Sequence, residues 1–157
     1  MSDERESHGR LRVDEGVLWT DGAARGNPGP AGAGAILKTP AGATLFAESR
    51  YLGVTSNNVA EYRALLLGLS RALELGVRRL EVRADSELLI KQLNGVYRVK
   101  SPLLKPLFEE ARALLAQFER ARLVHVRRAL NVEADELANQ GVDARDSVAS
   151  ASKSADR

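Results

Sequence analysis

Residues 17–52 read VLWTDGAARGNPGPAGAGAILKTPAGATLFAESRYL, and this stretch determines how the fold begins. Three apolar runs have the length and composition of strands and lie at 17–20, 32–37 and 44–52. A glycine-rich stretch at 22–30 separates the first two runs, and Pro40-Ala41-Gly42 separates the last two. Because short turns of this kind join neighbouring antiparallel strands, we predict a three-stranded meander.

Beyond the meander, helical and strand patterns alternate. Ser56 or Asn57 can cap the next helix, which Gly76 ends, and Ser101 with Pro102 marks a later helix start. The expected segments are helices at 57–75, 86–94, 101–119 and 131–142, and strands at 79–84 and 122–127. The order βββ-α-β-α-α-β-α requires crossovers between parallel strands. We therefore predict an α/β fold in which helices flank a mixed five-stranded sheet.

These patterns occupy residues 16–143, which we interpret as one domain of the 157-residue chain. Residues 1–15 and 144–157 lack apolar periodicity, and we expect both segments to be disordered. The chain has no cysteine, which excludes disulfide scaffolds, thiolate metal sites and cysteine nucleophiles. No apolar stretch approaches the roughly 20 residues of a membrane span, and the polar N-terminus is no signal peptide. We expect a cytoplasmic protein without membrane contact.

Two acidic residues follow predicted strands. Asp21 is expected to end the first strand, and Asp85 follows the strand at 79–84. The ends of strands in α/β sheets are common positions for functional sites. An ordinary structural role remains open for each, because aspartate also forms turns and caps helices.

Glu61 lies within a helical pattern and points toward its apolar side. At 100° per residue, Leu65, Leu69 and Ala72 fall on the same side of the helix as Glu61. No lysine or arginine stands three or four residues away, so an inward carboxylate needs another partner or a metal ion. The alternative is a carboxylate at the edge of the apolar arc that reaches water.

Asp135 is a fourth candidate, although acids in a first helical turn also interact favourably with the helix dipole. Together, clustered carboxylates without histidine or cysteine make an all-oxygen site that suits Mg²⁺ or Mn²⁺ rather than zinc. Four like charges would repel one another unless cations lay among them. Two such ions roughly 4 Å apart can activate a water molecule and stabilise the leaving oxygen of a phosphodiester.

Five blocks of this sequence resemble ribonuclease HI, in the order in which that family carries them. They are TDG (20–22), GNPGPAG (26–32), TSNNVAE (55–61), ADSEL (84–88) and NVEADELA (131–138). The resemblance covers about 16–143 and implies the ribonuclease H fold. It also implies a monomeric endonuclease that hydrolyses the RNA strand of RNA/DNA hybrids with Mg²⁺, leaving 5′-phosphate and 3′-hydroxyl ends. The implied ligands of two metal ions are Asp21, Glu61, Asp85 and Asp135.

The resemblance also implies contacts with the hybrid. The residues concerned are Gly22, Asn27, Ser56, Asn57 and Asn58. Glycine permits close approach of a nucleic-acid backbone, and asparagine can donate to phosphate or to a 2′-hydroxyl. A plain hairpin turn and helix caps would explain the same residues. The glycine turn lacks the Gly-Lys-Ser/Thr ending of a P-loop, which argues against a nucleotide site.

This chain departs from the family pattern in two places. Many members carry a long basic insertion between two helices, whereas the corresponding segment here is only residues 95–101. Arg98, Lys100 and Lys105 either form a smaller basic surface that binds the hybrid or are ordinary solvated charges. Better-known members also place a histidine in the loop before the last helix. His125 has that spacing but alternates within a predicted strand, so we predict that Arg128 is the auxiliary residue near the scissile phosphate.

Two other functions remain open. One is a DNA-cutting nuclease of the resolvase or integrase type on the same fold, which would not need Asn27 or the Asn57-Asn58 pair. The other is a hybrid-binding module without catalysis, against which the presence of all four acids argues.

Overall fold

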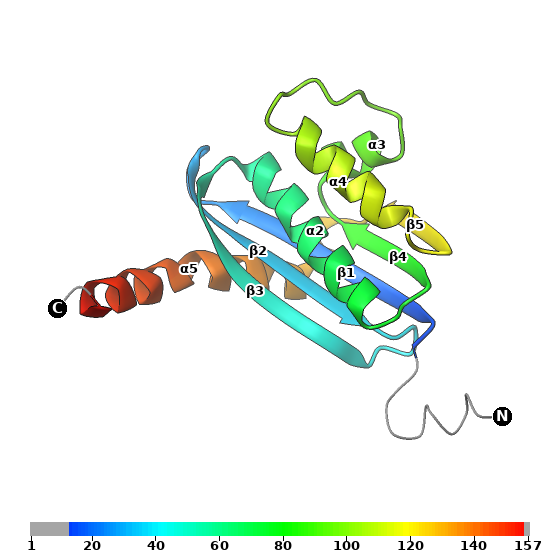
Figure 1. Cartoon of the computed structure of the whole chain (residues 1–157), viewed down its shortest axis with the longest axis horizontal. Coiled ribbons are helices and arrows are strands. Elements are labelled where there is room, and N and C mark those ends of the chain that lie inside the picture. The colour runs from blue at the N-terminus through cyan, green and yellow to red at the C-terminus, as the bar shows by residue number, and fades with distance from the viewer. Residues whose placement is uncertain (1–12, 156–157) are drawn as a thin grey trace.

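The computed structural model describes residues 13–155 (Figure 1). The strands are β1 (Glu15–Ala24), β2 (Gly29–Lys38), β3 (Thr44–Thr55), β4 (Arg79–Ala84) and β5 (Arg120–His125). The helices are α2 (Asn57–Glu74), α3 (Glu87–Leu93), α4 (Lys105–Leu115) and α5 (Val132–Ala155), with a 3-10 turn at Arg128–Leu130. The predicted element order is confirmed.

The strands form one mixed sheet in the order β3-β2-β1-β4-β5. β1 pairs antiparallel with β2 and parallel with β4, and β2 also pairs antiparallel with β3. β4 and β5 are parallel. The predicted meander followed by parallel strands is therefore confirmed, and β1 lies where the two kinds of pairing meet.

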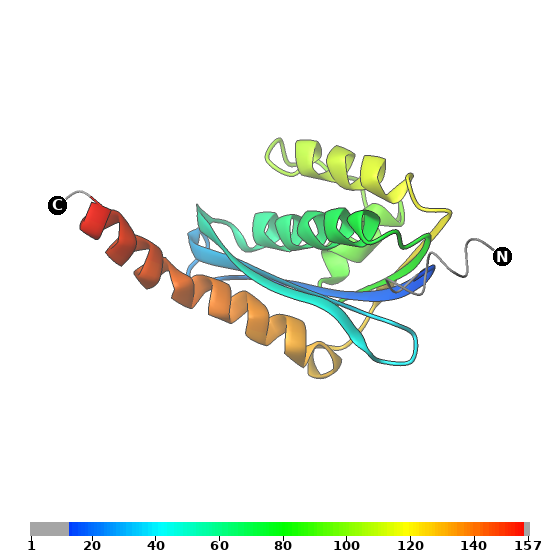
Figure 2. The same ribbon diagram turned by 60° about the horizontal axis from the view of Figure 1, so that its bottom comes forward.

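Helices cover both faces of the sheet (Figure 2). α5 packs on β1, β2 and β3, while α2 packs on the other face and carries α4 on its outer side. The main core lies between α2 and the sheet and includes Leu18, Tyr62 and Leu65, each at most 1% exposed. No helix within residues 13–155 is long and apolar enough to cross a membrane.

Two glycines of β2 let α5 approach the sheet closely. A Cβ atom on Gly32 would lie 2.2 Å from the Ala138 carbonyl oxygen, and one on Gly34 would lie 2.4 Å from that of Ala134. Any larger residue at either position would push the helix away, because backbone atoms cannot yield as a flexible side chain does. These glycines therefore fix the distance of the first turns of α5, which carry Asp135, from the sheet.

The first strand is longer than predicted. β1 continues through Ala24, so Asp21 lies inside the strand rather than at its end, and the turn shortens to residues 25–28. The extension pairs with β2 through Asp21↔Gly34 and Ala24↔Ala31. Glycine and alanine have weak strand preferences, and here pairing with a neighbouring strand overrides them.

The boundaries of α4 and α5 also differ from prediction, and α4 ends at Leu115 rather than 119. α4 begins at Lys105 rather than 101, because Pro106 has no N–H to donate to the carbonyl four residues earlier. α5 continues to Ala155, so most of the expected disordered tail 144–157 is helical instead. No glycine or proline follows Gly141 to end that helix. Residues 1–12 of the expected disordered N-terminal segment lie outside the described residues.

Candidate active site

The pairing of β1 with β4 brings two of the predicted acids together. Thr20 lies opposite Ala84 in the last pair of this parallel ladder, and the next residues are Asp21 and Asp85. Asp85 is not the cap of α3: Ser86 performs that role, its Oγ accepting from the Leu89 N–H at 3.2 Å. The capping explanation of Asp85 is therefore wrong.

Gly22 brings Glu61 to the same place. A Cβ atom on Gly22 would lie 2.3 Å from the Ala60 carbonyl carbon, so only glycine lets β1 contact the backbone of α2 here. The Gly22 N–H also donates to the Glu61 carboxylate. α2 begins at a cap formed by Ser56, whose Oγ accepts from the Val59 N–H at 3.2 Å. This cap sets the helix so that Glu61 faces the sheet.

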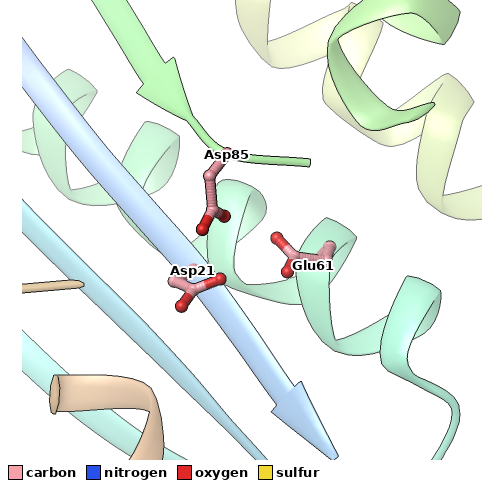
Figure 3. A group of neighbouring side chains, drawn as sticks. All are labelled: Asp21, Glu61 and Asp85. Carbon is pink, nitrogen blue, oxygen red and sulfur yellow. The ribbon is translucent and has the colours of Figure 1, made fainter. Parts of the chain in front are cut away.

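Asp21, Glu61 and Asp85 converge on one point (Figure 3). Each contributes a carboxylate oxygen, and these three oxygens lie within 4.8 Å of one another. Asp21 is 5% exposed and Glu61 is 4% exposed. The prediction that Glu61 points inward is confirmed, and the alternative of a carboxylate reaching water is wrong.

Burial and mutual repulsion favour the protonated forms of the two buried acids. Burial, followed by the nearby charge of Glu61, raises the pKa of Asp21 to about 10. Burial also raises the pKa of Glu61 to about 7, although hydrogen bonds from Asp21 and the Gly22 N–H partly oppose this rise. The pair therefore retains a proton at neutral pH in the absence of a cation.

The donor set fits a hard divalent cation. All ligand atoms in the group are carboxylate oxygens, which Mg²⁺ and Mn²⁺ prefer. The Oε2 atom of Glu61 is buried and has no hydrogen-bond partner within the described structure, which is costly unless an ion binds it. A cation would satisfy that oxygen and replace the shared proton.

Asp135 lies apart from this tight group but borders the same space. It is half-buried in the first turn of α5, and its side chain is one of the groups that raise the pKa of Asp21. The structure thus brings three of the four predicted acids within ligand distance of one point, and Asp135 lines the same cleft.

Asn131 holds α5 against β1 and was not predicted as a site residue. Its side chain is 1% exposed, and Nδ2 donates to the Thr20 carbonyl oxygen at 2.9 Å. Its own carbonyl oxygen accepts from the Asp135 N–H at 3.1 Å. Asn131 therefore connects the residue before Asp21 to the turn that carries Asp135. In the sequence it is typical of a helix cap, which does not reveal a bond to a distant strand.

The acids open into a cleft of about 440 Å³. Its lining residues are Asp21, Gly22, Ala23, Ala24, Arg25, Asn57, Glu61, Asp85, Ser86, Arg128, Asp135 and Asn139. All four predicted acids and two arginines therefore face one space. This distribution of charge suits a polyanion that approaches together with cations.

The structure separates the two candidates for the auxiliary residue. Arg128 lines the cleft, is 82% exposed, and places Nη2 3.9 Å from Oδ1 of Asp135. His125 is the exposed last residue of β5 and does not line the cleft. It lies near Glu87 instead: Lys91 is the main group that lowers the pKa of Glu87, and His125 adds a smaller effect. The placement favours Arg128, whose role stays a prediction.

The predicted hybrid-binding residues have structural roles as well. Oδ1 of Asn27 accepts from the Asn57 N–H at 3.1 Å, which ties the β1–β2 turn to the start of α2. Ser56 caps α2, as one alternative proposed, whereas Asn57 lines the cleft and Asn58 is exposed beside it in the chain. Their contacts with a hybrid stay a prediction.

Comparison with known proteins identifies the family. The chain matches the Reverse transcriptase-like family over residues 19–141. It is 46% identical over 129 residues to the bifunctional protein Rv2228c of Mycobacterium tuberculosis, which covers 82% of this chain and 35% of that protein. It is 42% identical over 125 residues to ribonuclease HI of Halobacterium salinarum, covering 80% of this chain and 63% of that protein. The chain belongs to the ribonuclease HI family.

A solved ribonuclease H has the same fold. LC11-RNase H1, determined in complex with an RNA/DNA hybrid, is 42% identical with a TM-score of 0.78, and the match covers 82% of this chain and 96% of that one. The chain spans less than two thirds of the length of either relative above. Within this ribonuclease HI fold, residues 94–104 join α3 to α4 without a helix or strand, as the short predicted connection requires.

Proposed function

We propose that this chain is an endonuclease that hydrolyses the RNA strand of RNA/DNA hybrids, leaving 5′-phosphate and 3′-hydroxyl ends. The observation that carries the proposal is the buried group of Asp21, Glu61 and Asp85 at the base of an open cleft. Two similar proteins are named ribonuclease HI or RNase H1, and one of them was solved with a hybrid bound. We further propose that the domain acts as a monomer.

Two divalent cations, Mg²⁺ or Mn²⁺, would bind among the four acids. Asp21 would contact both ions, Glu61 and Asp85 would hold one of them, and Asp135 would hold the other. Such ions, when bound, make an attacking water more acidic and stabilise the charge of the leaving oxygen. The carboxylates must be ionised to hold them, so binding removes the proton shared by Asp21 and Glu61.

The protein itself holds the acids in place before substrate arrives. Gly22 fixes α2 against β1, and Asn131 fixes α5 against the same strand. Because both helices are fastened on either side of Asp21, the ligand positions need little rearrangement on binding. Arg128 then stands at the open side of the cleft, where its guanidinium can pair with phosphate oxygens.

Selection of the RNA strand would depend on groups that can contact a 2′-hydroxyl. The candidates are the backbone at Gly22 and the side chains of Asn27, Ser56, Asn57, Asn58 and Glu61. The bond between Asn27 and the Asn57 N–H holds the turn and the helix start at a fixed spacing. Polar groups held at a fixed spacing can distinguish the shape of a hybrid from that of B-form DNA.

The test is cleavage of end-labelled substrates of one sequence as RNA/DNA hybrid, DNA duplex and RNA duplex. Each is incubated with Mg²⁺, with Mn²⁺ and with a chelator, and the product ends are mapped. The proposal expects metal-dependent cuts in the RNA of the hybrid and none in duplex DNA. Preferential DNA cleavage would favour the alternative DNA nuclease, and hybrid binding without cleavage in either metal would favour a binding module.

A further inference from the structure

The β1–β2 turn, residues 25–28, carries a cation that the proposed mechanism does not use. This residue is Arg25, which lines the cleft together with Arg128. Its Nη1 lies 2.7 Å from Oδ1 of Asp143, and its Nη2 donates to the Asn139 carbonyl oxygen at 3.4 Å. Both contacts are to α5, beyond Asp135 along the helix.

The ion pair between Arg25 and Asp143 contributes little to holding the turn. The two side chains are 45% and 65% exposed, and solvent screens such pairs strongly. The turn is fastened by other bonds: Asn27 accepts from the Asn57 N–H, and the Arg25 N–H donates to the Pro30 carbonyl oxygen at 2.9 Å. The guanidinium is therefore not needed to shape the turn, and it can exchange its carboxylate partner for another anion.

Arg25 lies farther along α5 from Asp135 than Arg128 does. Asp135, Asn139 and Asp143 lie at intervals of four residues, so they share one side of α5. Four residues of helix rise by about 6 Å. The Arg25 guanidinium therefore stands about one to two helical turns beyond Asp135, whereas Arg128 stands next to it. The two arginines therefore line the same cleft at different positions along α5, Arg128 beside Asp135 and Arg25 farther along the helix.

We propose that Arg25 binds a backbone phosphate of the hybrid adjacent to the phosphate that is hydrolysed, with Asp143 holding its guanidinium in place until the substrate displaces it. The inference rests on the proposed function, because it names a further substrate-binding residue of the same cleft. A planar guanidinium suits this exchange, since it pairs with carboxylate and with phosphate through the same two-pronged geometry.

The experiment compares Arg25→Ala, Arg25→Lys and Asp143→Asn with wild type on one hybrid over a range of salt concentrations. Arg25→Ala should raise KM about tenfold with kcat nearly unchanged, as expected from loss of one charge-assisted contact to bound substrate. The dependence of log kcat/KM on log salt should become shallower by about one, because one phosphate contact is lost. Arg25→Lys should recover part of the binding.

Asp143→Asn gives the sharpest discrimination. If Asp143 competes with phosphate for Arg25, its removal lowers KM. If Arg25 serves only to tether the turn to α5, Asp143→Asn and Arg25→Ala both raise KM, and the salt dependence stays that of wild type; this result would overturn the inference. Arg120→Ala removes the same charge from an exposed residue at the opposite end of the parallel strands, and it is the matched control.

Failure of this inference is distinguishable from failure of the proposed function. A wild-type protein that does not cleave hybrid in either metal refutes the function itself. A wild-type protein that cleaves hybrid, beside an Arg25→Ala variant with unchanged KM and salt dependence, refutes only the role of Arg25.

Discussion

The four acids that line the cleft form an inner pair and an outer pair, which differ in how deeply they are buried. Asp21 and Glu61 lie within β1 and α2 and are 5% and 4% exposed. Asp85 and Asp135 lie at the ends of elements and are half-buried. Buried carboxylates are costly to ionise, whereas half-buried ones retain contact with water. We therefore expect the buried pair to depend far more on a bound cation than the outer pair does.

Glycine makes this difference possible. Gly22 allows β1 and α2 to touch beside Asp21 and Glu61, the two acids that are almost fully buried. On the outer side, Asp85 follows a strand end and Asp135 borders an open cleft with exposed Arg128. The cleft thus combines buried acids on closely packed elements with half-buried acids at its open surface.

We expect the largest loss of activity from a substitution in the buried pair, Asp21 and Glu61. Asp21→Asn removes the negative charge common to both proposed cation positions while keeping the shape of the side chain. We expect hybrid cleavage to fall at least a thousandfold, about 4 kcal/mol in the activation barrier, with the fold retained. Hydrolysis rates and thermal melting of the same preparation provide the measurement.

Asp135→Asn makes the same substitution in the outer pair, and it should lose less activity than Asp21→Asn. Asp21→Asn activity within about tenfold of wild type, equivalent to ~1.4 kcal/mol, would show that Asp21 is not a shared ligand. The distinction between the inner and outer acids would then fail.

We expect a smaller loss of activity from Arg128, which lies beside Asp135 of the outer pair. Arg128→Ala should reduce turnover about 10- to 100-fold, roughly 1.4–2.8 kcal/mol, because it removes a permanent charge beside Asp135. His125→Ala should cost little, since His125 lies outside the cleft lining. Steady-state kinetics of both variants on one hybrid decide between them. A large loss for His125→Ala beside normal Arg128→Ala would reverse the assignment.

The sequence predicted which acids come together better than it predicted their arrangement. The inward orientation of Glu61 follows from helical spacing alone, and the bounds of β4 agree with the alternating pattern at 79–84. The position of Asp21 inside β1 was missed because its turn-like glycines gain strand conformation only by pairing with β2. Local patterns do not contain such long-range pairing.

The role of Asn131 shows the same limit. Its bond to the Thr20 carbonyl oxygen joins residues 111 positions apart. The adjacency of Asp21 and Asp85 likewise depends on the register between β1 and β4, where a shift of one residue would turn one carboxylate to the other face. The length of α5 beyond Val142 was missed because that segment lacks an apolar stripe, although it also lacks any residue that would end a helix.

The buried pair also predicts a dependence of stability on pH. The pKa values of Asp21 and Glu61 are about 10 and about 7 in the folded protein, against about 4 in an unfolded chain. The folded state thus holds more protons than the unfolded state over this range, so its stability falls as pH rises. Without metal, Tm should decline from about pH 5 to about pH 9. Saturating Mg²⁺ should flatten the decline, because it requires the ionised forms; a decline that Mg²⁺ leaves unchanged would contradict the assignment.

The most direct test of the claim that the buried pair depends on a cation is thermal melting of wild type and Glu61→Gln, each with Mg²⁺ and with a chelator. The substitution removes the buried charge while keeping the size of the side chain. Without metal, the variant should be more stable by on the order of 2 kcal/mol, or about 4–8 °C in Tm. With Mg²⁺ this advantage should disappear, because wild type gains binding energy that the variant loses. A metal-free variant that melts at or below the wild-type temperature would contradict the account.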